Sequence, residues 1–147
     1  MNKRSNEEEF RRLVSVYQQY QAQIEMIARE LGLAQINLEG VERASLAIET
    51  MKNSDDLGQD MLVPIGGGSF VHTKLADTNK VVVNIGAGVS VEKTAADARE
   101  IMDKRKKDII EASKKLTDVL HSIENEMAKV QSAIEKLEKA AGSERIV

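Results

Sequence analysis

The chain has 147 residues, of which 41% are hydrophobic, 31% charged and only 3% aromatic, a composition that suits a coiled coil better than a compact core. The absence of cysteine excludes disulfides and thiolate metal sites, and a formal net charge of −3 without a basic stripe argues against nucleic-acid binding. No apolar run approaches the roughly 18 to 20 residues that span a bilayer, so we expect a soluble protein with no membrane partner.

The first part of the chain carries a heptad pattern. Apolar side chains recur at alternating spacings of three and four residues from Phe10 to Ile48, and no proline interrupts them. Such a pattern is typical of a coiled-coil helix whose a and d positions face a partner helix. We therefore predict a helix over residues 9–52, followed by polar turn residues.

A β-rich insert over residues 61–92 comes next, because its apolar and polar residues alternate with a period of two. Glycine supplies the positive φ that tight reversals need, and two reversals are expected, at Gly66 to Gly68 and at Gly86 to Gly88. Four strands are predicted, over residues 62–65, 71–75, 81–85 and 89–92.

The two middle strands are expected to pair with each other. A three-residue loop at Asp77 to Asn79 places like faces opposite one another. The predicted pairs are Leu75 with Val81, Thr73 with Val83 and Val71 with Ile85. Because the rest of the chain offers no globular core to cover these strands, we interpret the insert as an assembly platform where sheets from several chains join.

The last part of the chain repeats the heptad pattern, from Ala95 to Ala140. Thr94 is a candidate N-cap and Ala141-Gly142 a candidate stop, so a second helix is predicted over residues 94–141. The two helices are expected to fold back as an antiparallel coiled-coil stalk. If seam residue numbers sum to 150, Arg105 meets Ser45, and sums of 143 or 157 remain open.

The apolar stripe widens away from the insert. In the second helix the e positions change from Arg99, Lys106 and Ser113 to Leu120, Met127 and Ile134, while Val14 and Val16 flank the seam of the first helix. Exposed apolar surface of this kind usually marks a partner-binding site. We interpret it as an adaptable tip that binds other proteins. Alternatively, the tails or another helix cover these residues permanently.

No motif in the chain carries chemistry. The segment that ends in Lys93-Thr94 resembles a phosphate loop, but Ala87 and Glu92 stand where that loop needs glycine. His72 has no nucleophile or paired carboxylate nearby, and His121 lies at the outermost heptad position of its helix. The basic run Lys104 to Lys107 is bracketed by aspartates and is interpreted as a solvated helix face. We predict no catalysis, no cofactor and no metal site.

Three segments resemble the archaeal α subunits of the prefoldin family: Leu62-Val63-Pro64-Ile65-Gly66-Gly67-Gly68, Asp77-Thr78-Asn79-Lys80-Val81 and Ile85 to Lys93. The resemblance covers essentially the whole chain, as a single subunit over residues 1–147, and the double hairpin fits the α class. Ser90 departs from it, since many relatives are expected to carry an aromatic residue there.

The resemblance implies an α+β fold, a long antiparallel two-helix coiled coil with a double β-hairpin insert that joins an oligomeric β-barrel. It also implies a cytoplasmic hexamer of two α and four β subunits that holds unfolded client proteins without ATP and passes them to a group II chaperonin. The expected client-binding residues are Phe10, Leu13, Val14, Val16, Met127, Ile134, Leu137, Ile146 and Val147. The expected assembly residues are Val63, Ile65, Phe70, Val71, Leu75, Val81, Val83, Ile85, Val89 and Val91. A structural coiled-coil tether of a larger complex is the alternative function.

Overall fold

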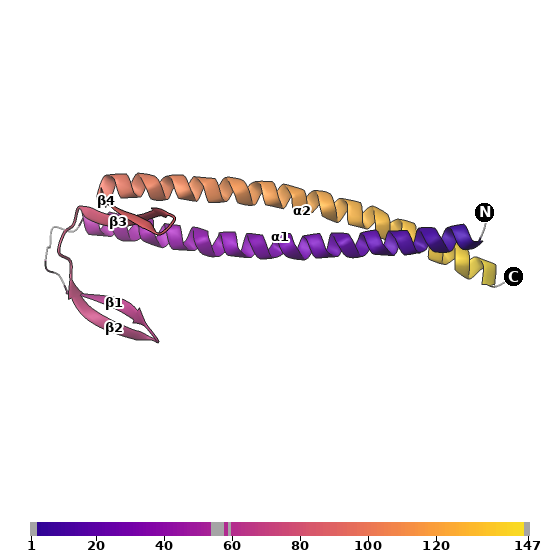
Figure 1. The fold of residues 1–147 in the computed structure, drawn as a ribbon, viewed down its shortest axis with the longest axis horizontal. Coiled ribbons are helices and arrows are strands. Elements are labelled where there is room, and N and C mark those ends of the chain that lie inside the picture. The colour runs from indigo at the N-terminus through magenta and orange to yellow at the C-terminus, as the bar shows by residue number, and fades with distance from the viewer. Residues whose placement is uncertain (1–2, 54–57, 59, 146–147) are drawn as a thin grey trace. The chain divides into compact units, whose positions relative to one another are not determined.

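The computed structural model describes residues 3–53, 58 and 60–145. Along the chain, four strands lie between two long helices, as Figure 1 shows, which confirms the predicted fold class. The elements are α1 (Lys3–Lys52), β1 (Asp60–Gly66), β2 (Ser69–Lys74), β3 (Lys80–Gly86), β4 (Val89–Thr94) and α2 (Ala95–Arg145).

Both helices are longer than the heptad pattern predicted. Helix α1 begins at Lys3, and α2 runs on to Arg145 instead of ending at Gly142. Gly142 has no positive φ, so it does not form the left-handed cap that ends many helices, and the stop predicted there is wrong. The start of α2 agrees better with expectation, because the Thr94 side-chain oxygen accepts a hydrogen bond of 3.2 Å from the Asp97 backbone N–H.

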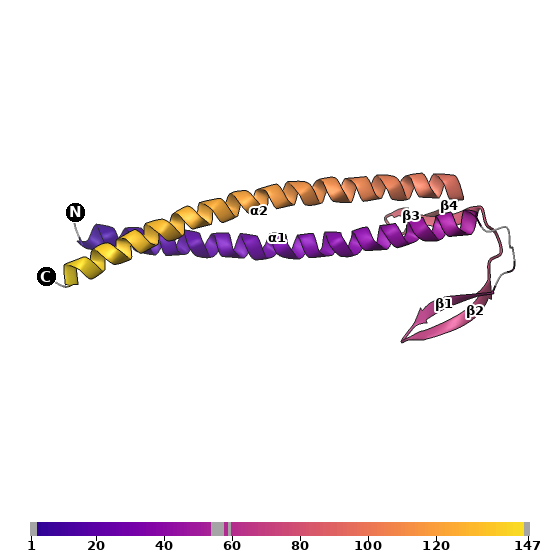
Figure 2. The same ribbon diagram turned by 180° about the vertical axis from the view of Figure 1, so that it is seen from behind.

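The chain divides into two compact units. The first, here the helical unit, consists of Met1–Ile36 and Glu111–Val147, and the second, here the hairpin unit, is Asn37–Ile110. Within the helical unit the described parts of α1 and α2 run antiparallel and side by side in both views (Figures 1 and 2). The hairpin unit holds the four strands together with the last turns of α1 and the first turns of α2.

The strands form two separate two-stranded sheets, β1 with β2 and β3 with β4. Val63 lies opposite Val71 in the first, and Val83 opposite Val91 in the second. The expected pairing of β2 with β3, including Leu75 opposite Val81, Thr73 opposite Val83 and Val71 opposite Ile85, is therefore wrong.

Hydrogen bonds at the expected middle loop explain this difference. The Asp77 carboxylate accepts a bond of 2.8 Å from the Asn79 backbone N–H, and the Asn79 carbonyl accepts one of 3.1 Å from the backbone N–H of Ala95. These residues form a local Asx turn and bond to the first residue of α2, so they do not close a hairpin. The glycine reversals join strands that are adjacent in the chain, as the sequence predicted.

The two hairpins repeat one backbone geometry with an offset of 20 residues. Gly66 and Gly86 have φ values of 104° and 112°, and Gly68 and Gly88 have 73° and 75°. Between them the first hairpin has Gly67 at 58°, whereas the second has Ala87 at 51°. An L-residue with a Cβ is disfavoured in this left-handed region by roughly 1 to 2 kcal/mol relative to the right-handed one, so the second turn is strained where the first is not.

Ala87→Gly is expected to stabilise the protein by about 0.5 to 1 kcal/mol, because it relieves the left-handed strain in the second turn. Urea unfolding followed by circular dichroism measures the change. The matched reverse substitution, Gly67→Ala, introduces the same strain at the equivalent position of the first hairpin. If both substitutions shift the unfolding midpoint in the same direction, the strain argument is wrong.

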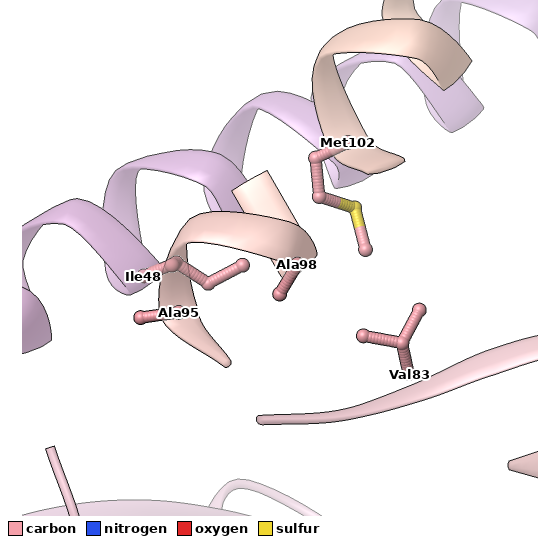
Figure 3. Packing of buried hydrophobic residues seen from close by; sticks show 5 residues of the cluster. All are labelled: Ile48, Val83, Ala95, Ala98 and Met102. Atoms are coloured by element: carbon pink, nitrogen blue, oxygen red, sulfur yellow. The ribbon is translucent and has the colours of Figure 1, made fainter. Parts of the chain in front are cut away.

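The core of the hairpin unit lies where β3 meets the two helices. Figure 3 shows Val83 directed towards Ala98 and Met102, with Ile48 and Ala95 farther along the same cluster. Val83 is only 2% exposed, and Ala95 and Ala98 are fully buried. Alanine at these two α2 positions lets the hairpin backbone approach the helix closely, so this small-residue surface positions β3 and β4.

Candidate functional site

Among the residues that the structure describes, none covers the first hairpin. Every residue of β1 is exposed, and among the expected assembly residues Val63 and Val71 are 37% and 40% exposed, while Ile65 and Phe70 are about 60% exposed. An uncovered apolar sheet with two free edges is a pairing surface for another chain. The structure therefore brings four of the expected assembly residues together on one exposed hairpin.

The second hairpin is different, because one of its faces is already occupied. Val83, expected to pack in a barrel between chains, instead belongs to the buried cluster of its own chain, and Val81 packs partly buried against that cluster. The prediction of Val83 as an interchain residue is wrong. Which face of a hairpin the helices cover depends on the tertiary fold and is not encoded by strand alternation. The remaining expected residues are either half-buried, Leu75 and Val91, or exposed, Ile85 and Val89.

Polar contacts fasten this second hairpin to α2. The Arg105 guanidinium donates a hydrogen bond to the backbone carbonyl of Asn84, near the turn. At the other end of the hairpin, Asn79 bonds to the backbone N–H of Ala95. Ser45 was the expected neighbour of Arg105 only if seam numbers sum to 150, and in the structure the Arg105 side chain bonds to the sheet.

Two ion pairs join the helices within the hairpin unit. The Arg99 guanidinium lies 3.0 Å from the Glu49 carboxylate, and the Lys106 ammonium lies 3.4 Å from the Glu42 carboxylate. In both pairs the residue numbers sum to 148, which agrees with seam layers summing to 150 better than with 143 or 157. All four side chains are 42% to 48% exposed, so each pair contributes at most about 1 kcal/mol.

The expected client-binding residues are less exposed than the sequence suggested. Leu13 is buried, at 9% exposure. Six others are half-buried in the helical unit: Phe10, Val14, Val16, Met127, Ile134 and Leu137. Ile146 and Val147 lie outside the described residues. These side chains line or flank the contact between α1 and α2, so they do not form a freely exposed patch.

The reason is a change of phase in α2. From Ile109 onward its half-buried row follows positions a and e of the predicted heptad, including Leu120, Met127 and Ile134, whereas the d residues Val119 and Glu126 are exposed. The seam predicted as a and d is therefore wrong for this part of α2, although it holds along α1. Larger apolar residues at the e positions were the signal in the sequence, because Met127 is a better seam residue than Glu126.

A groove opens at the ends of the helices that carry the chain termini. It has a volume of about 660 Å³ and its apolar lining is centred on Phe10 and Leu137. Charged residues of both signs surround these two side chains, among them Lys3, Glu7 and Glu138. An apolar floor with a mixed polar rim accepts an extended or helical peptide segment without requiring one charge pattern.

At this end of the helical unit, Arg12 and Glu9 form an ion pair on the surface of α1. The Arg12 guanidinium donates to the Glu9 carboxylate over 2.7 Å, and this hydrogen bond lowers the pKa of Glu9 and raises that of Arg12. The Arg12 and Glu9 side chains are 63% and 45% exposed, so water and salt screen the pair. Protein binding at this end is consequently expected to depend on apolar contact more than on this ion pair.

Sequence reasoning missed a second apolar row on α1. Met26, Leu33 and Ile36 are 56%, 63% and 62% exposed, and they lie outside the a and d positions. Their spacing of seven and three residues places them on one face of the helix. That spacing was visible in the sequence but lay outside the heptad seam that organised the prediction.

Neither metal chemistry nor membrane insertion is indicated. In residues 3–53, 58 and 60–145, no group of three or more histidine, cysteine, aspartate or glutamate side chains is placed to hold a metal ion. Neither helix, over its described length, is long and apolar enough to cross a membrane.

Comparison with known proteins agrees with this architecture. A family profile described as Prefoldin subunit matches residues 20–140. Prefoldin subunit alpha of Methanothrix thermoacetophila is 48% identical over 112 residues, covering 76% of this chain and 72% of the relative. The protein of the same name from Pyrococcus horikoshii is 30% identical over 134 residues, covering 91% and 90%.

A solved structure shares the fold. A chain of filamentous PFD from Methanocaldococcus jannaschii, determined by cryo-electron microscopy, superimposes with a TM-score of 0.70 at 21% identity, over 80% of this chain and 97% of that chain. Two long helices with two hairpins between them are the class of fold that this chain shares with that structure. The chain belongs to the prefoldin family, and the resemblance to its archaeal α subunits is confirmed.

Proposed function

We propose that the chain is the α-class subunit of a cytoplasmic prefoldin hexamer of two α and four β subunits. In this complex it acts as an ATP-independent holdase that captures unfolded proteins at its coiled-coil tips and delivers them to a group II chaperonin. The observation that carries the proposal is the match to the prefoldin family over residues 20–140. The uncovered apolar hairpin β1–β2 supports assembly with other chains.

The two hairpins contribute unequally to assembly under this proposal. Residues such as Ile65 and Phe70 supply the exposed side chains of β1–β2, which join a β-barrel shared with β subunits. The β3–β4 hairpin adds its free edges and the exposed Ile85 and Val89, while Val83 holds it to the helices.

Client binding is proposed for the helical unit. The groove floored by Phe10 and Leu137 offers an apolar surface at the ends of the helices, and Val14 and Val16 extend it along α1. Ile146 and Val147, which lie outside the described residues, stay in the proposed set on their sequence alone. Flexible Met127 suits varied partners, since methionine adapts to irregular apolar surfaces. Such a surface holds many unfolded chains weakly.

Light scattering tests the holdase function. A denatured, aggregation-prone protein is diluted into buffer without ATP, first with this chain alone and then with this chain plus its β-class partner. We expect suppression of aggregation that needs the partner and is unchanged by added ATP. Absence of suppression by a hexamer verified by mass would contradict the holdase and favour a coiled-coil tether.

A further inference from the structure

Helix α2 carries two overlapping rows that can each face α1. The rows share the a positions, among them Leu116, Ile123 and Val130, and differ in whether d or e residues accompany them. The d row is Ala112, Val119, Glu126 and Ala133, and the e row is Ser113, Leu120, Met127 and Ile134. In the structure the whole e row is half-buried. In the d row only Ala133 is half-buried, whereas Ala112 is exposed, Val119 is 48% exposed and the Glu126 side chain is 52% exposed.

The two arrangements differ by a small turn of the helix about its axis. Successive residues on an α-helix are about 100° apart, so exchanging d for e beside an unchanged a row turns the buried face by about 50°. The a residues remain in the seam throughout, and most of the apolar packing is thus common to both arrangements. Only the d and e rows exchange environments, one entering the seam as the other leaves it.

Glu126 biases this choice towards the observed arrangement. In the d arrangement its carboxylate enters an apolar seam, which is unfavourable without a partner. In the structure it is exposed and lies 3.0 Å from the Lys129 ammonium. Leu120 and Met127, by contrast, are removed from water in the e arrangement. The bias is a property of a few residues, so a small number of substitutions suffices to reverse it.

The d side of the seam borders a shallow surface groove. This groove of about 290 Å³ is open to solvent beside Tyr20 of α1, and its α2 wall includes Val119, Ser122 and Glu126. In the observed arrangement the d-row side chains that line it therefore border open surface and not packed atoms.

The e arrangement begins at an irregular spacing. The buried or half-buried residues Met102, Arg105, Ile109 and Ser113 are separated by three, four and four positions, which is an 11-residue step rather than a heptad. Such a step locally unwinds the left-handed supercoil. In the part of α2 before Ile109 the d residues lie in the seam. Ala98 is fully buried there, and Arg105 bonds to the Asn84 carbonyl. The change of row is therefore confined to the residues after Ile109.

We propose that residues 112–134 of α2 turn between two arrangements, the observed one that keeps Leu120, Met127 and Ile134 against α1, and a second that presents this e row to a non-native polypeptide. The proposal rests on the holdase function proposed above. In the first arrangement the adhesive side chains are sheltered from other chains. In the second a bound unfolded segment covers them, and the apolar surface buried against that segment compensates for the packing against α1 that the e row gives up.

Single cysteines report the arrangement, because the natural chain contains none. In the complex with the β-class partner and without client, Val119→Cys is expected to react with an alkylating reagent at least about tenfold faster than Leu120→Cys, since exposure governs access to the thiolate. Adding Glu126→Leu and Ala133→Leu places leucine at two of the four d positions, and it is expected to reverse this order of rates.

The matched control is Asn125→Leu with Ser132→Leu, which adds two leucines at exposed positions outside both rows and is expected to leave the order of rates unchanged. An order unchanged by Glu126→Leu/Ala133→Leu in a complex of normal helicity would overturn the proposal. If that variant does not assemble, Met127→Glu tests the same reversal by placing a carboxylate in the e row.

Aggregation suppression separates this proposal from the holdase function itself. The alkylation experiment contains no client, so its outcome does not depend on client binding. If the rates reverse, the d-row variant is expected to suppress aggregation at a severalfold lower concentration than the natural complex, because its e row is presented. Reversed rates with unchanged suppression would refute the client-binding role of the e row. Failure of the natural complex to suppress aggregation would instead refute the holdase function.

Discussion

Replacing Ala98 with leucine is expected to destabilise the hairpin unit by about 1 to 3 kcal/mol, the usual effect of adding methylenes to a packed core. Ala98 is fully buried in the cluster of Val83, Ile48 and Met102. Its methyl group faces β3 (Figure 3), so the larger side chain pushes the β3–β4 hairpin away from α2. A lower midpoint in urea unfolding, followed by circular dichroism, measures the loss.

Ala96→Leu is the matched control, because Ala96 is exposed on the same turn of α2. The same three carbon atoms added there are expected to change stability by less than about 0.5 kcal/mol. Displacement of the hairpin is also expected to reduce the yield of hexamer with the β-class partner, which size-exclusion chromatography with light scattering measures. Equal stability of the two variants would mean that Ala98 does not seat the hairpin.

Changing Val14, Val16 and Ile134 together to serine is expected to leave the hexamer intact and to weaken aggregation suppression by roughly tenfold in the concentration required. Burying a valine or isoleucine side chain contributes about 1.5 to 3 kcal/mol when the burial is complete, and a loss of about 1.4 kcal/mol lowers affinity tenfold. Partial burial of these side chains in the helical unit reduces the contribution of each to client binding. Light scattering of a denatured protein measures the effect.

The comparison variant changes Met26, Leu33 and Ile36 to serine. These three side chains are more than half exposed on α1 and lie outside the proposed client site. We expect near-normal suppression from this variant, and circular dichroism establishes that both variants retain their helices. If it loses suppression as strongly as the first variant, client binding belongs to the outer face of α1.

The elements of the fold were predictable because their periods differ. Apolar spacing of three and four residues predicted both helices, and the glycines at residues 66–68 and 86–88 predicted both reversals. Strand pairing was not predictable from the same pattern. Asp77 and Asn79 are typical turn residues, and such residues can either form a hairpin loop or hydrogen-bond to the first residue of a helix, here α2. The hydrogen bonds of Asn79 to Ala95 decide between them only in the folded chain.

The candidate site, like the fold, could be predicted from the sequence only in part. The apolar residues expected to bind clients stay a prediction as a group, but the exposure of those that the structure describes was overestimated, because the predicted seam in α2 followed the d residues. Comparing the charged Glu126 at a d position with the apolar Met127 at an e position would have placed the e positions in the seam. The burial of Val83, by contrast, follows from which hairpin face meets Ala95 and Ala98, and strand alternation leaves that choice open.

The exposed side chains of β1–β2 also bear on how the protein is best produced. A chain made in excess carries an apolar hairpin with two open edges, and such surfaces pair with copies of themselves when nothing else covers them. We therefore expect synthesis together with a chain that covers Val63, Ile65 and Phe70 to raise the yield of usable subunit.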